Sequence, residues 1–154
     1  MLASMRLLFV IRIFLPFAAG YYLSYTFRTI NAVIAPELAR EIGIDAAGLG
    51  LLTAVYLLTF AAFQIPLGVL LDRYGPKSTQ VVLLMFAVLG AVIFAGAESA
   101  GGLIIGRALI GFGVSGCLMA SFKAFVLYFP RHHLPLANGI IFMIGGIGAM
   151  SSTT

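Results

Sequence analysis

The sequence predicts an all-α membrane protein with five transmembrane helices. Hydrophobic residues make up 62% of the 154-residue chain and charged residues only 9%, whereas an ordinary soluble domain carries about 25% charged residues. The stretches 46–71 and 78–97 contain no charged residue, and about 20 apolar residues suffice for a helix to cross the hydrocarbon core of a bilayer. A soluble core cannot explain this composition, so the lipid bilayer is the expected environment.

Each expected span has a boundary signal. The first span is expected to end before Pro36, because proline disrupts a helix interior. A polar loop then leads to Asp45, whose position before Ala-Ala-Gly is typical of a helix start. Glu98 marks the end of the third span, and Pro130 follows the fourth. The predicted spans are 11–34, 46–71, 78–97, 102–129 and 137–154.

A charged hairpin joins the second and third spans. Its distinctive residues are Gly68, Asp72, Arg73, Gly75 and Lys77. Gly68, four residues before the acid, would let two helix ends approach closely. Gly75 would supply the backbone freedom for a reversal of direction. Asp72 and Arg73 are then expected to face the ends of other helices.

The cations predict the topology. One side of the membrane would hold Arg6, Arg12, Arg73, Lys77 and Arg131, and the other Arg40 alone. Because positive charge concentrates in cytoplasmic loops, the N-terminus is expected in the cytoplasm. The nine Lys and Arg residues are scattered singly, so nucleic acid is not an expected partner. The single cysteine and the spacing of the histidines give no metal site, and no cofactor is expected.

Arg28 is a charge deep inside the first span. At 1.5 Å per residue it lies ~24 Å along the helix from Arg12, too deep for an interfacial anchor. Tyr21, Tyr25 and Asn31 share its face of the helical wheel. A charge in a span costs at least ~2.5 kcal/mol and normally faces a bundle interior or a watery cavity. The face therefore predicts anion recognition; the alternative is an arginine that reaches outward or bonds backbone carbonyls.

Three stretches resemble one known family. The hairpin pattern Gly-x-x-x-Asp-Arg-x-Gly-x-Lys resembles the loop between helices 2 and 3 of the major facilitator superfamily of secondary transporters. The first span resembles first helices of its anion-transporting members, in which an arginine at about the depth of Arg28 contacts the substrate. The stretch 128–139 resembles their connection between helices 4 and 5. The resemblance covers essentially the whole chain and implies five of the six helices in an N-terminal half.

The fourth span carries the pattern Leu-x-x-x-Arg-x-x-x-Gly-x-Gly around Arg107, which resembles the family's fourth helix. That resemblance implies that Arg107 faces the central cavity; the alternative is an arginine pinned by carbonyls. Lys123 is expected to extend toward the cytoplasmic interface as a structural residue. Thr53 and Gln64 form a polar stripe on the second span, which is typical of hydrogen bonds between helices.

These observations predict the N-terminal part of a secondary transporter, a symporter or antiporter that moves a small organic or inorganic anion by alternating access. Arg28, Tyr21, Tyr25, Asn31 and Arg107 are the expected substrate-binding residues, and the hairpin is the expected gating loop. The last stretch ends within a span, so we expect a truncated sequence whose C-terminal half is missing. The inner membrane of a bacterium is the expected location.

Two alternatives stay open. A non-catalytic assembly subunit would pack its apolar helices against another membrane protein. A membrane-embedded enzyme is the weaker alternative, because the spans contain no metal-spaced histidines, no paired carboxylates and no serine–histidine constellation. We therefore expect no enzymatic activity.

Overall fold

The structure is a computed structural model that describes residues 2–152, with side chains from residue 11 onward. These residues form helices and connections without any strand, which confirms the predicted all-α class. The helices are α1 (Leu2–Glu41), α2 (Ala46–Ala62), α3 (Gln64–Ala95), α4 (Ala100–Val114), α5 (Cys117–Tyr128) and α6 (Leu134–Ser151), with a short 3₁₀ helix, η1 (Arg131–His133), before α6.

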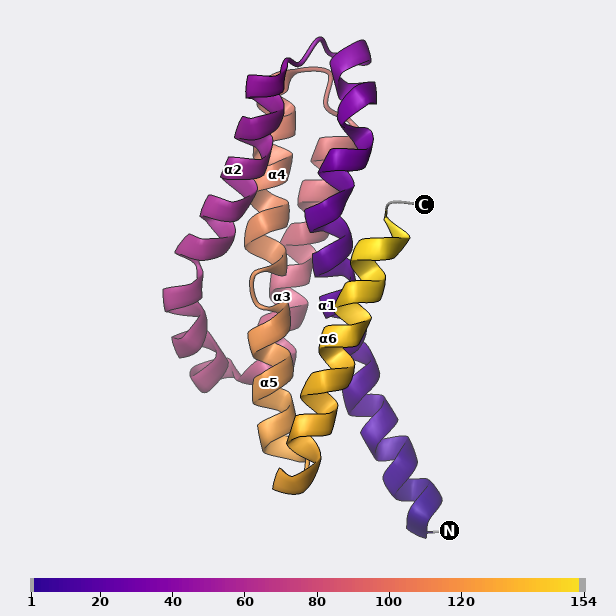
Figure 1. The fold of residues 1–154 in the computed structure, drawn as a ribbon. Coiled ribbons are helices and arrows are strands. Elements are labelled where there is room, and N and C mark those ends of the chain that lie inside the picture. Colours follow the sequence, from indigo (N-terminus) through magenta and orange to yellow (C-terminus); the bar gives the residue numbers. More distant parts are fainter. Residues whose placement is uncertain (1, 153–154) are drawn as a thin grey trace.

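The described residues form a bundle of five legs that run alternately up and down (Figure 1). The legs are α1, α2 with the first part of α3, the rest of α3, α4 with α5, and α6. The start of α1, the turn within α3 and the α5–α6 connection lie toward one end, which we call the lower end (Figure 1). The connections 42–45 and 96–99 lie at the upper end.

The hairpin makes its turn at Gly75. This residue has φ 78° and ψ 164°, while its neighbours on both sides are helical, so α3 contains the end of the second leg and the whole of the third. Such backbone angles are essentially restricted to glycine. The predicted role of Gly75 in reversing the chain is therefore confirmed. Gly68 differs from the prediction, because an added Cβ there would meet no atom within 4 Å.

Two of the legs are bent at the same level. Phe63 separates α2 from α3, and the pair Ser115 and Gly116 separates α4 from α5. The hydroxyl of Ser115 donates to the Phe112 carbonyl at 2.7 Å, a local bond that competes with the helix ladder. The Gln64 amide donates to the Ser115 carbonyl at 3.1 Å across the two legs. This bond confirms the expected use of Gln64 between helices.

The expected helix end at Pro36 is wrong. Helix α1 continues through Pro36 to Glu41, so most of the predicted polar loop is helical. A proline inside a helix removes one hydrogen bond, but the last turn gains packing in return. Leu38 lies in a small upper core with Ile44 and Leu52. The N-cap of α2 is as predicted, since the Asp45 carboxylate accepts from the Gly48 amide at 2.8 Å.

Helices α3 and α4 pack backbone against backbone. A Cβ added at Gly90 would lie 2.8 Å from the Gly106 carbonyl oxygen, and one added at Gly106 would lie 2.9 Å from the Gly90 oxygen. Ala87, also on this surface, is 1% exposed. Small residues allow such close approach in membrane bundles, where packing drives helix association.

The outer surface is apolar. By length and composition, three helical segments within the described residues are apolar enough to cross a membrane: Gln64–Ala95, which includes the turn at Gly75, Ala100–Tyr128 and Arg131–Ser151. Helix α2 is apolar but shorter, and the start of α3 completes its leg. Ile65 is 87% exposed and Leu58 is 69% exposed. Exposed apolar surface on this scale is typical of a membrane protein.

Candidate functional site

Arg28 lies on α1 as an exposed cation between aromatic rings. Its guanidinium carbon is 5.2 Å from the centre of the Tyr25 ring and 5.1 Å from the centre of the Phe60 ring, which belongs to α2. No carboxylate of the described residues lies within 4 Å of it. Ring faces hold a cation without neutralising its charge. The charge of Arg28 is therefore not compensated by any carboxylate of the described residues.

Aromatic side chains surround the neighbouring part of α1. Tyr21 is 4% exposed and meets Tyr25 edge to face, with ring centres 5.1 Å apart. On its other side Tyr21 meets Phe142 of α6 at 6.2 Å. Tyr56 of α2 is buried and donates to the Ser24 carbonyl at 3.4 Å. Tyr21 and Tyr25 thus lie beside Arg28 as predicted from the helical wheel, and Tyr21 is largely covered.

Arg107 has a different setting, because it is 2% exposed. Its Nη1 donates to the Phe27 carbonyl at 2.9 Å, and its Nη2 donates to the Asn31 side-chain oxygen at 2.7 Å. The guanidinium carbon also lies 4.8 Å from the centre of the Phe94 ring. Its Nε is buried and has no hydrogen-bond partner among the described residues. The arginine on α4 is thereby bonded to α1.

Asn31 extends this network to a third leg. Its amide nitrogen donates to the Thr53 hydroxyl at 2.9 Å, and that hydroxyl donates to the Leu49 carbonyl at 3.2 Å. The network joins α4, α1 and α2 through Arg107, Asn31 and Thr53. The predicted residues therefore form two groups: Arg28 with the tyrosines, and Arg107 with Asn31. Carbonyl bonding, the alternative stated for Arg107, accounts for one of its two hydrogen bonds.

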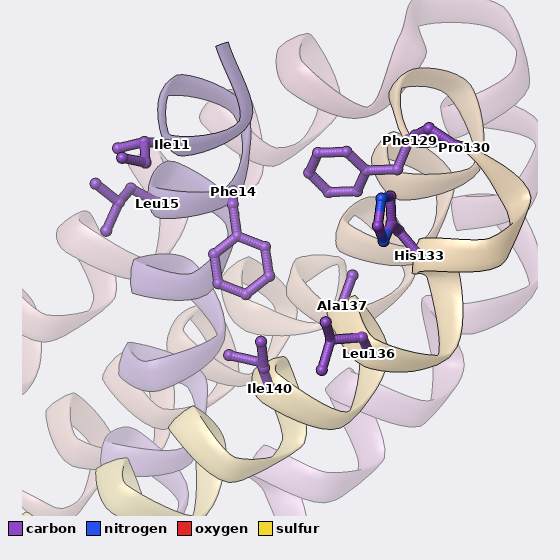
Figure 2. A pocket seen from close by; sticks show the side chains of 9 residues that line it. All are labelled: Ile11, Phe14, Leu15, Phe129, Pro130, His133, Leu136, Ala137 and Ile140. Carbon is purple, nitrogen blue, oxygen red and sulfur yellow. The ribbon is translucent and has the colours of Figure 1, made fainter. Parts of the chain in front are cut away.

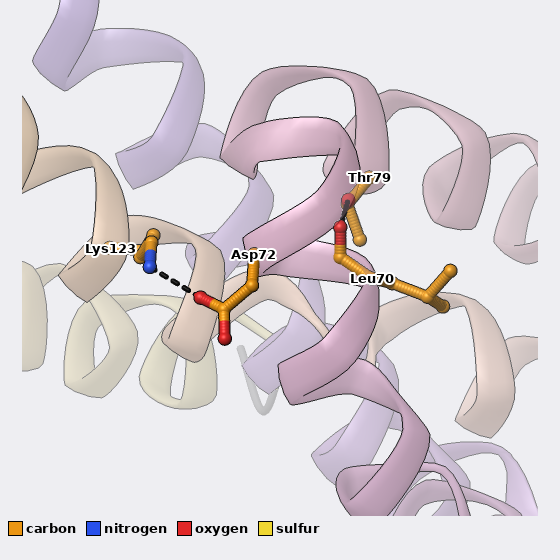
Figure 3. Close-up of polar contacts among 4 residues, drawn as sticks. All are labelled: Leu70, Asp72, Thr79 and Lys123. Carbon is orange, nitrogen blue, oxygen red and sulfur yellow. Dashed lines mark hydrogen bonds and ion pairs between the residues drawn. The ribbon is translucent and has the colours of Figure 1, made fainter.

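The hairpin carries an ion pair that the sequence did not predict. Lys123 Nζ of α5 lies 2.5 Å from an Asp72 carboxylate oxygen (Figure 3). The Thr79 hydroxyl donates to the Leu70 carbonyl at 3.3 Å and closes the turn from within (Figure 3). Asp72 therefore faces another helix, as expected. Lys123, expected only to extend toward the interface, binds a second leg instead.

The remaining hairpin residues, apart from Gly75, have three different settings. The Arg73 guanidinium lies over the ring of the adjacent Tyr74, 5.4 Å from its centre. Gly68 lines a groove of about 540 Å³ that also contains the Asp72–Lys123 pair. Lys77 lines a separate groove together with Arg12. The expected gating role of these residues stays a prediction.

One groove is apolar and lies away from the predicted site. It has a volume of about 560 Å³ and lies between the start of α1 and the start of α6 at the lower end (Figure 2). Ile11 and Phe14 face Leu136 and Ile140 across it, and His133 is its one ionisable side chain (Figure 2). Such a lining suits hydrocarbon better than a small anion.

Sequence reasoning missed the partners of both arginines. Phe60 and Phe94 contact the guanidinium groups of Arg28 and Arg107, but the chain contains 13 phenylalanines. No spacing distinguishes these two from the phenylalanines that are exposed on the outer surface. The polar stripe on the second span had indicated Thr53 as a partner for another helix, and its bond to Asn31 confirms that.

The side chains around Arg28 have a chemistry that suits an anion. An arginine offers paired donors that match carboxylate and similar oxyanions, and a low dielectric strengthens the attraction. Among the described residues, no group of three His, Cys, Asp or Glu residues could hold a metal ion. The expected role of Arg28 in binding an anion stays a prediction.

Comparison with known proteins gives consistent matches. The family model of the Major Facilitator Superfamily matches residues 17–153. A probable sulfoacetate transporter of Cupriavidus necator is 29% identical over 128 residues, which cover 83% of this chain and 30% of that protein. A nitrate/nitrite transporter of Picosynechococcus is 30% identical over 86% of this chain and 25% of its own length. A galacturonate transporter of Dickeya chrysanthemi is 31% identical over 85% of this chain and 38% of its own length.

Proposed function

We propose that this chain, which belongs to the Major Facilitator Superfamily, forms part of a secondary transporter that moves a small organic or inorganic anion by alternating access. The observation that carries the proposal is the setting of Arg28: an exposed guanidinium, held between two rings, without a carboxylate partner in the described chain. A cation in a membrane span costs insertion free energy, so its presence there indicates a functional purpose. Binding an anion would supply that purpose.

The relatives support the sign of the substrate. Their names give sulfoacetate, nitrate or nitrite, and galacturonate as transported species. All are anions at neutral pH, although they differ in size and in the group that carries the charge. We propose that Arg28 binds the anionic group, with Tyr25 and Tyr21 beside it. Asn31 and Arg107 contribute by fixing α1 at this level.

The chain spans about a quarter to two fifths of the length of these three relatives. We therefore propose that it supplies one wall of the substrate cavity and acts with further helices. In this superfamily the substrate lies between two halves that rock against each other. Arg28 lies ~24 Å along α1 from Arg12, a depth that suits a site near the midplane.

We further propose a cytoplasmic lower end, because Arg12, Arg73, Lys77 and Arg131 gather there. The inner membrane of a bacterium is the proposed location. The test uses intact cells that express a variant without Cys117. A cysteine placed at Tyr74 should resist an impermeant reagent applied from outside, whereas one placed at Ser99 should react. The opposite pattern would reverse this topology.

Arg28→Ala tests the anion site in the complete transporter. Loss of a charged hydrogen-bonding partner should weaken anion binding by about tenfold to a hundredfold. Ligand-induced thermal stabilisation would be measured with sulfoacetate, nitrate and galacturonate at equal ionic strength. Arg28→Lys should retain part of the effect, because lysine keeps the charge but loses the paired donors.

Arg73→Ala is the matched control, since Arg73 is also an arginine over a tyrosine ring but belongs to the hairpin. It should leave anion affinity unchanged. Expression of Arg28→Ala should hold, because the exposed side chain has no carboxylate partner among the described residues and its removal eases insertion. A well-expressed Arg28→Ala protein with unchanged affinity for all anions would refute the site.

A further inference from the structure

A groove at the lower end has two cations at its mouth. It lies between the start of α1 and the part of α3 that follows Gly75, with the end of α5 beside it, and its volume is about 370 Å³. Arg12 of α1 and Lys77 of α3 both line it and are both exposed. Tyr128 at the end of α5 completes the mouth. Three legs that are distant in sequence thus meet around one opening.

These two cations are not neutralised by the chain. No carboxylate of the described residues lies within 4 Å of Arg12 or Lys77. Asp72 is the one acidic residue of the hairpin, and it pairs with Lys123. The other four acids, at positions 37, 41, 45 and 98, belong to the upper end. The mouth of the groove is therefore a site of positive potential.

The lining of the groove changes from charged to polar to apolar along its length. Along α3 the lining passes from Lys77 to Gln80 and then to Leu84, so the charge and the apolar end are ~10 Å apart at 1.5 Å per residue. Along α1 it passes from Arg12 to Phe17 in the same direction. A phospholipid has the same order: a charged phosphate, a polar ester region and a hydrocarbon chain.

Gln80, which is 5% exposed, joins the two walls of the groove between its charged mouth and its apolar base. Its amide nitrogen donates to the Pro16 carbonyl at 3.3 Å, a bond that joins α3 to α1. The same side chain lies against Gly20, where an added Cβ would overlap it. The spacing between the two walls is therefore set by a buried polar contact. This makes the groove a built feature of the bundle.

We propose that this groove binds one anionic phospholipid of the surrounding leaflet, with the headgroup phosphate between Arg12 and Lys77 and an acyl chain along Leu84. Basic pockets between helices on the cytoplasmic side are a general form of lipid recognition. A soluble anion would use the two cations but would leave the apolar base unoccupied. The groove is distinct from the Arg28 site, which lies ~24 Å farther along α1.

The test measures lipid binding to the purified full chain by native mass spectrometry and by thermal unfolding in mixed micelles. The probes are dioleoylphosphatidylglycerol and dioleoylphosphatidylcholine, which share acyl chains and differ in net charge. We expect one tightly retained phosphatidylglycerol and a higher unfolding temperature than with phosphatidylcholine. The double variant Arg12→Gln/Lys77→Gln should bind phosphatidylglycerol roughly thirtyfold more weakly, because each cation near the membrane surface contributes about 1 kcal/mol to the binding of an anionic lipid.

Arg73→Gln/Arg131→Gln is the charge-matched control, because it removes two cations of the same end that do not line the groove. It should change the affinity less than threefold. Equal losses in the two double variants would overturn the proposal in favour of nonspecific surface charge. Inorganic phosphate that stabilises the chain as well as phosphatidylglycerol does would overturn it in favour of a phosphate site. Leu84→Trp, which fills the base, should weaken lipid binding while both cations stay in place.

Discussion

Asn31→Ala should destabilise the bundle by uncoupling Arg107 from α1. The side-chain oxygen of Asn31 accepts a 2.7 Å bond from Arg107 Nη2, and its amide donates a 2.9 Å bond to Thr53. Because Arg107 is 2% exposed, the alanine leaves a charged donor buried without an acceptor. A hydrogen bond to a charged group contributes about 1.5–3 kcal/mol. A neutral bond between membrane helices adds about 0.6 kcal/mol.

The expected loss is therefore about 2–4 kcal/mol in the free energy of unfolding. Steric trapping in bicelles would measure it without extrapolation from strong denaturant. Thr53→Val is the internal control, because it breaks only the neutral link and should cost less than about 1 kcal/mol. Asn31→Asp keeps an acceptor for Arg107 and should cost less than the alanine variant. Equal losses for Asn31→Ala and Thr53→Val would refute the reasoning, since the charged bond would then contribute nothing.

Three further predictions concern the hairpin and the α3–α4 contact. Gly75→Ala should cost about 1–3 kcal/mol of unfolding free energy because of its backbone angles. Gly68→Ala, in open space, should cost under about 0.5 kcal/mol. Thermal unfolding of the two variants would measure both costs. Asp72→Asn should lower the rate of transport more than the affinity for substrate, and Lys123→Gln should reproduce that pattern if their ion pair is the element involved; equal loss of rate and affinity would argue against gating. Gly106→Ala should cost about 1–3 kcal/mol by overpacking, because the new Cβ would lie 2.9 Å from backbone of α3.

The sequence predicted the features that depend on local chemistry. The absence of charge over long stretches gave the helical class, and Gly75 and Asp45 gave a turn and a helix start that the structure has. These signals work because each depends on one residue and its immediate neighbours. The bend at Phe63 has no such signal. Pro36 gave a misleading one, because tertiary packing of the last turn outweighs a single lost hydrogen bond.

The site was predicted less completely, because a helical wheel defines a face but not its neighbour. Tyr25 and Arg28 were placed together correctly, since both belong to one helix. Whether Phe60 or a carboxylate lies opposite Arg28 depends on how the second leg is rotated and how far it is shifted along its axis. Those quantities depend on the close packing of α2 against Gly111 of α4 and on the bends, which involve residues distant in sequence. The pairing of Lys123 with Asp72 was missed for the same reason.

The two arginines of the spans have unequal settings, and the difference has a mechanical consequence. Arg107 bonds the carbonyl of Phe27, which directly precedes Arg28 in α1, while its second bond reaches Asn31 one turn farther on. Asn31 in turn binds Thr53 of α2, the helix that also provides the Phe60 ring over Arg28. The backbone that carries Arg28 is thus fixed to α4 and α2 on both sides of that residue. An anion bound to Arg28 would then move α1, α2 and α4 together as one rigid body. The proposed rocking of a whole half around a central site requires such a rigid body.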